Sequence, residues 1–321
     1  MQEGFSFQLF MNELIIGKVD IFYRYINDLG LASKFEPFKF VDKTLTLSTF
    51  MRSLLILIIV AVGVVSCSKF AKVQKSTDYD YKLRMAEKYY VAKKYNFAQQ
   101  LYEELFPLYK GQPQFEDLFY KYAYCSYYLR DWLQAENLFK QFVEVFPTSP
   151  RAEEMEYMRA YTYYRQSPKA ELDQTNTQKT MGLMQTFINT HPASARSKEA
   201  SDIIDKCRIK LELKQYKSAE LYYNMGHYHA AAIAYTTLLN DFPESGKSED
   251  YKVQVIKSYY LYANNSIEDK KASRYEQVIN ECNDFTDRFP ESKLSKDVEK
   301  YMNLSQNNIK AIQNEQVKKT N

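Results

Sequence analysis

Hydrophobic and polar positions after residue 66 follow helical rather than strand spacing. Amphipathic segments with few glycines occur in pairs, and a short proline-containing tag follows each pair. Proline and small polar residues at such a tag end one helix and cap the next. The tags are FPTSP at 146, HPASA at 191, FPESG at 242 and FPESK at 289, with an earlier FPLYK at 106. The pattern predicts an all-α chain of about five helix pairs.

Small and aromatic residues recur at fixed spacing inside three of these pairs. Two alanines stand twelve residues apart, and an aromatic residue follows the second alanine by four. The sets are Ala86, Ala98 and Tyr102; Ala123, Ala135 and Phe139; and Ala219, Ala231 and Tyr235. Such spacing lets two antiparallel helices approach closely beside an aromatic ring. It resembles the tetratricopeptide repeat, whose helix pairs stack into a solenoid.

Two pairs depart from this spacing. The intervals Ala160–Thr180 and Ser258–Val278 span twenty residues instead of twelve, which predicts an eight-residue insertion in the third and fifth pairs. The polar stretches SPKAELDQTNTQ and NNSIEDKKAS can contain these insertions. The second stretch is expected to form a mixed-charge loop that orients a protein partner. A solvated loop without a partner is an equal alternative. Its adjacent charges are Glu268, Asp269, Lys270 and Lys271.

A long helix, roughly 197–224, is expected to link the third and fourth pairs. We therefore divide the mature chain into three parts. These are residues 67–196 with repeats one to three, residues 197–313 with repeats four and five, and a polar tail at 314–321.

The segment MRSLLILIIVAVGVVSCSKF, residues 51–70, carries the longest apolar run. Its twelve apolar residues would rise only about 18 Å as a helix, too short for a hydrocarbon core of about 30 Å. A buried core helix would normally carry polar positions at helical spacing. A secretion signal at 51–66, with Arg52 as its basic start, fits better.

Val64-Val65-Ser66-Cys67 at the end of this segment resembles the bacterial lipobox. We therefore expect Cys67 to carry a covalent N-terminal lipid, and we expect no other cofactor. Residues 1–50 are expected to be an upstream extension of the gene model, with Met51 as the true start; a real cytoplasmic extension is the alternative.

Charge and reactive residues exclude several function classes. The net charge is only +3 and no basic stripe stands out, so nucleic acid is not an expected partner. The chain has no nucleotide-binding glycine loop and no nucleophile elbow, and its three histidines do not form a metal site, so we expect no enzyme. Cys125, Cys207 and Cys282 are expected to be buried small residues, a disulfide between two of them being the alternative.

Tyrosine is abundant, with 29 residues, and it recurs where the first helix of a repeat faces the concave groove of a solenoid. The twelfth repeat position is Tyr90, Tyr127, Tyr164, Tyr223 and Tyr262 in the five pairs. Repeats two and three add Tyr120, Tyr124, Tyr128, Tyr157 and Tyr161. Eight of these ten tyrosines lie in repeats one to three, all except Tyr223 and Tyr262. We predict that these eight form a peptide-binding groove whose rings stack on apolar side chains. Simple packing of a tyrosine-rich chain is the alternative.

The lipobox, five repeats with interrupted third and fifth members, and the segment YYNMGHYHAAAIAYTTLLNDFPES at 222–245 together resemble the BamD family of outer-membrane lipoproteins. The resemblance implies a periplasmic scaffold of the β-barrel assembly machinery, held on the outer membrane by its lipid. It implies two partners, a BamA-like barrel-forming protein and unfolded outer-membrane proteins.

Two other classes remain open at this point. One is a periplasmic repeat protein that coordinates cell-wall synthesis, which would normally lack acylation at Cys67. The other is a glycan-binding surface lipoprotein, which would normally be longer and stack sugars on tryptophan. The single tryptophan, Trp132, lies in the turn of the second repeat, where helix packing explains it.

Overall fold

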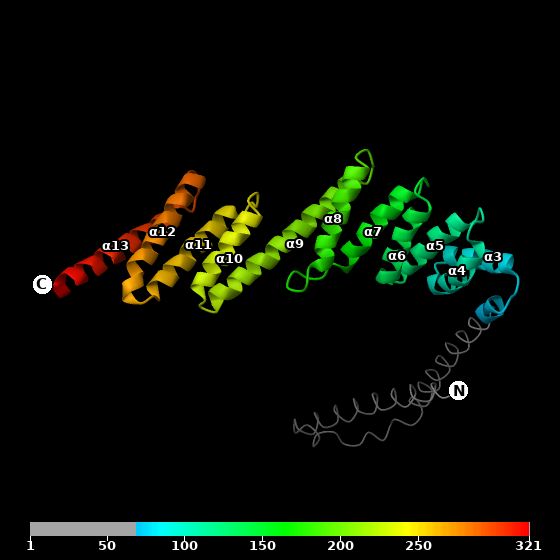
Figure 1. Ribbon diagram of the computed structural model, residues 1–321, viewed down its shortest axis with the longest axis horizontal. Coiled ribbons are helices and arrows are strands. Elements are labelled where there is room, and N and C mark those ends of the chain that lie inside the picture. The colour runs from blue at the N-terminus through cyan, green and yellow to red at the C-terminus, as the bar shows by residue number, and fades with distance from the viewer. Residues whose placement is uncertain (1–68, 321) are drawn as a thin grey trace, which may run out of the picture. The chain divides into compact units, whose positions relative to one another are not determined.

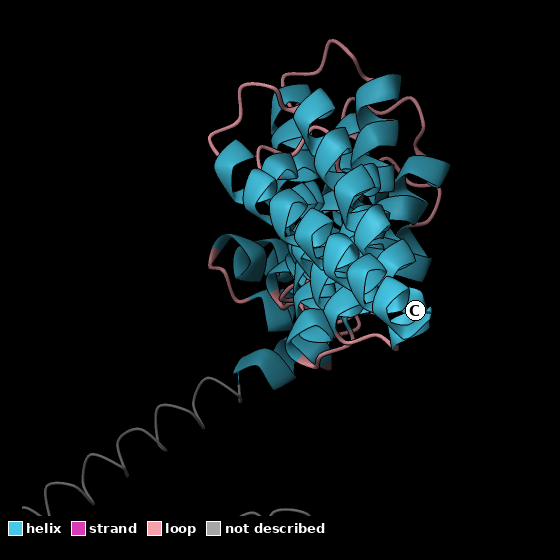
Figure 2. Cartoon of the chain, turned by 90° about the vertical axis from the view of Figure 1, so that its left-hand side faces the viewer, coloured by secondary structure: helices cyan, strands magenta, loops and turns pink. Residues whose placement is uncertain are grey.

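The computed structural model describes residues 69–320. The chain divides into two compact units, Met1–Ser76 and Thr77–Asn321, and the second is described here by itself. Within the described range the chain has no strand, and short turns join the helices (Figure 2). No helix of this range has the length and apolar content needed to cross a bilayer. The expected extension, signal peptide and Cys67 lie outside the described residues.

Helices α3 to α13 form five consecutive pairs and one final helix (Figure 1). The pairs are α3 (Tyr79–Val91) with α4 (Tyr95–Tyr109), α5 (Phe115–Tyr128) with α6 (Trp132–Val145), α7 (Ala152–Gln166) with α8 (Thr175–Thr190), α9 (Ser197–Asn224) with α10 (Tyr228–Asp241), and α11 (Ser248–Asn264) with α12 (Glu268–Arg288); α13 (Ser295–Thr320) follows. Each helix packs on the next along the chain. The prediction of an all-α tetratricopeptide-repeat solenoid with five pairs is confirmed.

The alanine and aromatic sets lie at the centres of their pairs. All six alanines have no exposed surface, and Tyr102, Phe139 and Tyr235 are at most 2% exposed. A residue larger than alanine would force the two helix axes apart, because the interior has no spare volume. Thr180 and Val278, which stand in place of the second alanine in the interrupted pairs, are also fully buried. The small-residue spacing therefore sets the distance between the helices in the three regular pairs.

A serine in each of the four later tags ties the turn to the first helix of the preceding pair. The hydrogen bonds join Ser149 to Glu116, Ser194 to Glu153, Ser245 to Glu212 and Ser292 to Glu249. Each serine Oγ also accepts the N–H two residues further on, which forms a local turn at the start of the next helix. We call these contacts the Ser–Glu ties.

The Ser–Glu ties also measure the insertion in the third repeat. Partners are 33 residues apart in the second and fourth pairs and 41 apart in the third, a difference of eight. Five of the extra residues are in the loop 167–174 between α7 and α8, which replaces a turn of three residues, and three lengthen the two helices. Gln174 organises this loop by donating to the carbonyls of Lys169 and Leu172 at 2.8 and 3.1 Å. The predicted eight-residue insertion in a polar stretch is confirmed here.

The long helix α9 spans Ser197–Asn224 and confirms the predicted linker. Three lysines on one side of α9 hold the third-repeat loop. Lys210 donates to Ser167 Oγ at 2.7 Å, Lys214 donates to the Leu172 carbonyl at 2.6 Å, and Lys217 pairs with Glu171. The loop therefore connects the third pair to the helix that begins the fourth.

Three details differ from the sequence expectations. The charged stretch Glu268–Lys271 is not a loop, because α12 begins at Glu268 and only residues 265–267 separate it from α11. Acidic residues in a first turn are favoured by the helix dipole. The Ser–Glu tie of this pair spans 43 residues, so the insertion is ten residues long and not the predicted eight, and it lengthens α11 and α12. The tail at 314–321, for which only a polar character was expected, is part of helix α13 through Thr320. The early tag FPLYK does not end its helix at once, since α4 continues past Pro107 to Tyr109 and the tag lacks the serine of the others.

Candidate functional site

Seven of the eight predicted groove tyrosines form one connected set of ring contacts in the second and third pairs. Tyr124 contacts Tyr120 and Tyr128, with ring centroids 4.8 and 5.8 Å apart. Tyr127 contacts Tyr128 on its own helix at 5.7 Å and Tyr161 on α7 at 6.5 Å. The structure therefore brings together side chains from α5 and α7 that the sequence spacing placed on the same face.

The remaining predicted tyrosines extend this set at both ends. Tyr161 stacks on Tyr157 at 5.8 Å and contacts Tyr164 at 5.7 Å. Tyr90 on α3 joins through Tyr95, whose ring lies 5.8 Å from Tyr90 and stacks on Tyr128 at 4.4 Å. We call the eight tyrosines together with Tyr95 the tyrosine face.

Tyr95 was not predicted from the sequence. It is the first residue of α4, and a second helix was not expected to contribute to the groove. The within-pair turn carries it there, since Lys93 adopts a left-handed conformation with φ 56° between the two helices. The aromatic residue directly after a within-pair turn is the signal that could have identified it.

Burial separates the members of the tyrosine face. Tyr157 and Tyr124 are buried, at 2% and 7% exposed. The other predicted rings are partly exposed, and Tyr128 is the most open at 46%. The packing alternative therefore holds for Tyr124 and Tyr157, which support the face from beneath.

Glu154 on α7 fixes the two tyrosines at the start of the face. Its carboxylate accepts hydrogen bonds from the hydroxyls of Tyr124 at 2.8 Å and Tyr120 at 3.2 Å. Arg196 in turn donates to Glu154 at 3.3 Å, and its guanidinium lies 5.0 Å from the centre of the Tyr157 ring. Sequence patterns do not reveal this group, because Glu154 is at least thirty positions from each of its three partners.

Arg151, Asp117, Lys121 and Glu87, at the α3–α5 side of the face, are paired with each other. Arg151 lies 4.4 Å from the centre of the Tyr120 ring and forms an ion pair with Asp117 at 3.0 Å. Lys121 bridges Asp117 and Glu87. Burial acts to raise the pKa of Asp117. The hydrogen bonds and positive charges of Lys121 and Arg151 outweigh burial and hold this pKa below its usual value. A ligand on this face would therefore meet mainly rings and hydroxyl groups.

Several hydroxyl groups of the face remain available. Within residues 69–320, the hydroxyls without a hydrogen-bond partner include those of Tyr90, Tyr127, Tyr128, Tyr161 and Tyr164. Burial raises the pKa of Tyr90, Tyr127 and Tyr128 above the ordinary tyrosine value, so these hydroxyls stay protonated and can donate at neutral pH. The face can therefore stack on apolar side chains and donate hydrogen bonds to peptide carbonyl groups.

The equivalent tyrosines of the last two pairs belong to other contacts. Tyr223 packs against Tyr228 at 5.6 Å. Tyr262 lies between the His229 ring, stacked at 4.5 Å, and the Arg274 guanidinium at 4.0 Å. The tyrosine at the twelfth repeat position thus has different neighbours in the two halves of the chain.

The remaining candidate residues are part of the packing. Cys125, Cys207 and Cys282 are buried free thiols, as their spacing predicted. His191 pairs with Glu156 at 2.8 Å at the end of α8. Among the described residues, no three His, Cys, Asp or Glu side chains are grouped as a metal site.

Three solved structures are among those similar to this chain. The TPR2AB domain of yeast Sti1, in a complex with pHSP90, is 13% identical and has a TM-score of 0.34, with 71% of this chain and 98% of that chain covered. A thermophilic TPR protein of Thermus thermophilus is 14% identical (TM-score 0.28; 71% and 98% covered). The yeast histone chaperone Hif1 is 12% identical (TM-score 0.25; 76% and 98% covered).

None of the curated proteins matches the chain. A family model does match it, over residues 78–274, which include all of the tyrosine face and most of the helix pairs. That family is described as outer membrane lipoprotein, YfiO. The chain therefore belongs to the YfiO family of outer membrane lipoproteins.

Proposed function

We propose that this protein is a lipid-anchored, non-enzymatic scaffold of the outer-membrane β-barrel assembly machinery. In this role it binds unfolded outer-membrane proteins and a BamA-like barrel-forming protein. It helps to bring the unfolded proteins to the barrel-forming protein, which inserts them into the membrane. Membership of an outer membrane lipoprotein family and a solenoid of five helix pairs support the proposal. The tyrosine face is the observation that carries it.

The tyrosine face has the properties of a site for extended apolar segments. Its partly exposed rings give a wide, rigid contact area that loses little conformational freedom on binding. Its available hydroxyls can satisfy the backbone of a chain that has not yet formed strands. The segments that it receives are the ends of unfolded barrel proteins, which carry aromatic and apolar side chains.

Photo-crosslinking in cells tests this role for the face. A photoreactive phenylalanine in place of Tyr128, which is 46% exposed, should capture unfolded outer-membrane proteins. The matched control is the same residue in place of Tyr222, which is 42% exposed and lies on α9 outside the face. Equal capture at the two positions would contradict the proposed site.

The lipid anchor is proposed at Cys67. Cleavage between Ser66 and Cys67 would expose the cysteine for acylation, and two or three acyl chains would hold the protein on the periplasmic side of the outer membrane. Each buried CH₂ group contributes about 0.8 kcal/mol, and stable anchoring needs more than one chain. Mass spectrometry of the mature protein should find a lipidated Cys67 and no peptides from residues 1–50. An unmodified Cys67 would contradict the anchor.

The barrel-forming protein is proposed to dock on the fourth and fifth pairs. The tyrosine face occupies the first three pairs, and α9 joins the two halves without a flexible linker. A photoreactive residue at Ile267, 70% exposed between α11 and α12, should therefore capture the BamA-like protein, whereas one at Tyr128 should not. Capture of that protein at Tyr128 alone would reverse the assignment.

A further inference from the structure

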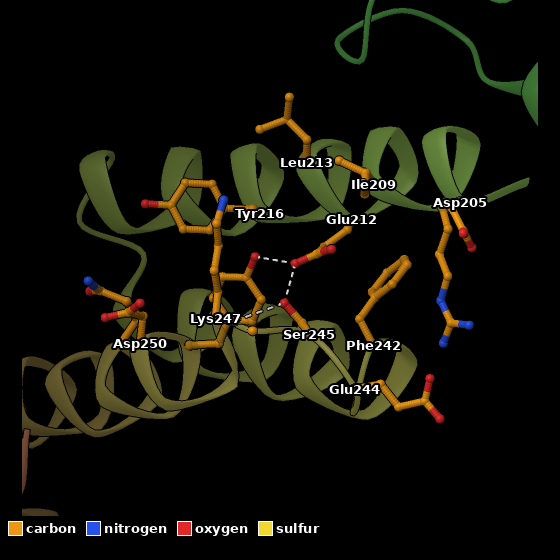
Figure 3. Close-up of a pocket in the computed structure, with 14 residues that line it drawn as sticks. Asp205, Ile209, Glu212, Leu213, Tyr216, Phe242, Glu244, Ser245, Lys247 and Asp250 are labelled. Atoms are coloured by element: carbon orange, nitrogen blue, oxygen red, sulfur yellow. Dashed lines mark hydrogen bonds between the residues drawn. The ribbon is translucent and has the colours of Figure 1, made fainter. Parts of the chain in front are cut away.

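A groove lies on the fourth pair, well separated in sequence from the tyrosine face. One wall is the middle of α9, residues 205–216, and the other is the turn and helix start at residues 242–254 (Figure 3). We call it the α9 groove. Its volume is about 1120 Å³. An open groove of this size has room for several side chains of a polypeptide.

One Ser–Glu tie holds the two walls of the groove together. Glu212 reaches from α9 toward the turn in Figure 3 and accepts hydrogen bonds from Ser245 at 2.5 Å and from the Tyr251 hydroxyl at 2.6 Å. Phe242 and Tyr251 are buried, at 8% and 2% exposed. The groove is therefore built on a packed base and does not need a ligand to form.

The α9 wall exposes large apolar side chains. Ile209 is 63% exposed and Leu213 is 41% exposed, and both line the groove. They stand one helical turn apart, so a partner segment can cover both at once. Between Cys207 and Ala219, α9 has no fully buried residue, and the side that carries Ile209 and Leu213 is open to a partner.

The charges along the groove indicate the chemistry of that partner. Its lining holds four carboxylates, Asp205, Glu212, Glu244 and Asp250, and two cationic groups, Arg208 and Lys247. Within the described chain, no ion pair neutralises any of the four carboxylates. Asp205, Glu244 and Asp250 are exposed. An acidic border around apolar side chains complements a segment with the opposite charge.

We propose that the α9 groove binds a linear segment of another polypeptide in which large apolar side chains lie between lysine or arginine residues. Ile209 and Leu213 contact the apolar side chains, and Asp205 and Glu244 contact the cationic flanks. The site differs from the tyrosine face both in position and in charge. It does not depend on which protein docks on the C-terminal half.

Two labelled synthetic peptides test the proposal with the complete mature chain. One carries leucine and phenylalanine between lysines, and the other is the same peptide with glutamate in place of each lysine. Fluorescence anisotropy should show that the lysine peptide binds about tenfold more tightly, and more weakly as salt is added. Equal affinities would overturn the proposed charge selection.

Charge reversal locates the binding. Asp205→Lys with Glu244→Lys should invert the preference, so that the glutamate peptide binds about tenfold more tightly than the lysine peptide. The control pair Asp287→Lys and Glu299→Lys reverses two exposed carboxylates on α12 and α13 and should leave the preference unchanged. An unchanged preference in the groove variant, with helical content intact, would overturn the proposal.

Shortening the apolar side chains gives a second readout. Ile209→Ala with Leu213→Ala should weaken binding of the lysine peptide about tenfold, since the lost contact is apolar area. Both positions are exposed, so the variant should fold normally. Undiminished binding in this variant, or loss of binding in Tyr128→Ala with Tyr161→Ala instead, would place the peptide outside the α9 groove. Undiminished binding in the Ile209 and Leu213 variant leaves the tyrosine face untested, so the two proposals can fail separately.

Discussion

The hydroxyl of Tyr124 donates a hydrogen bond of 2.8 Å to Oε1 of Glu154, and this bond joins α5 of the second pair to α7 of the third. The Tyr120 hydroxyl shares the same carboxylate. Because Tyr124 is only 7% exposed, its hydroxyl cannot turn to bulk water when the acceptor is lost. This contact therefore fixes the position of the rings that lie above it.

Removal of this acceptor should destabilise the N-terminal pairs. Glu154→Ala leaves the buried Tyr124 hydroxyl without its partner, which should lower the free energy of unfolding by about 1–3 kcal/mol. Glu154→Gln keeps a hydrogen-bond acceptor and should lower the free energy of unfolding by less than Glu154→Ala does. Urea unfolding followed by circular dichroism measures both. Equal losses in the two variants would show that the carboxylate acts through charge alone.

The Ser–Glu ties should each contribute to the junction between neighbouring pairs. Ser149→Ala removes both the hydrogen bond to Glu116 and the local turn that begins α7. The loss should be about 1–2 kcal/mol in the free energy of unfolding. Ser218→Ala, at an exposed position on α9, is the control and should change stability by less than about 0.5 kcal/mol. A variant at Ser149 that matches this control would show that the ties are not stabilising.

The within-pair turns carry one left-handed residue in three pairs, Lys93, Arg130 and Gly226, with φ of 56°, 62° and 78°. Only the glycine adopts this conformation without strain. We expect Arg130→Gly to raise the free energy of unfolding by about 0.5–1 kcal/mol and Gly226→Ala to lower it by about 1 kcal/mol. A β-carbon at Gly226 would meet no atom within 4 Å, so the loss would come from the backbone alone. Thermal unfolding should show a higher midpoint temperature for Arg130→Gly and a lower one for Gly226→Ala.

High pH should unfold the protein through its buried tyrosines. Burial raises the pKa of Tyr122 to about 12, and burial with the Glu154 hydrogen bond raises the pKa of Tyr124. In the unfolded chain tyrosine ionises near pH 10. Since the folded-state pKa is raised, the stabilisation is fully present below about pH 10 and is lost as the pH rises through the folded values. The part of the tyrosinate absorbance that comes from buried tyrosines should change together with the helical circular dichroism. Complete ionisation near pH 10 with the helices intact would contradict this burial.

The sequence predicts the repeats well because their main determinant is local. Two small residues twelve apart permit close packing of one helix pair, and Ala219 and Ala231 show it directly, since both are fully buried. The tyrosines of α5 and α7 could be predicted for the same reason, because helical spacing fixes which residues share a face.

Contacts between pairs could not be predicted in the same way. Glu154 meets Tyr124 only because the stacking of two pairs brings together residues 30 positions apart. The fifth insertion was misplaced because polar composition alone does not separate a loop from a solvated helix. Glu268 and Asp269, which suggested a charged loop, are also the residues that favour a helix start.

The affinity of an aromatic-ended barrel-protein peptide for the full mature chain tests the central claim most directly. Tyr128→Ala with Tyr161→Ala removes two partly exposed rings of the tyrosine face and leaves Tyr124 and Glu154 in place. We expect this variant to bind the peptide about tenfold or more weakly than the unchanged protein, because each ring contributes buried apolar area. Tyr222→Ala should bind as the unchanged protein does. Equal affinity in all three proteins, with equal helical content, would contradict the assignment of substrate binding to the tyrosine face.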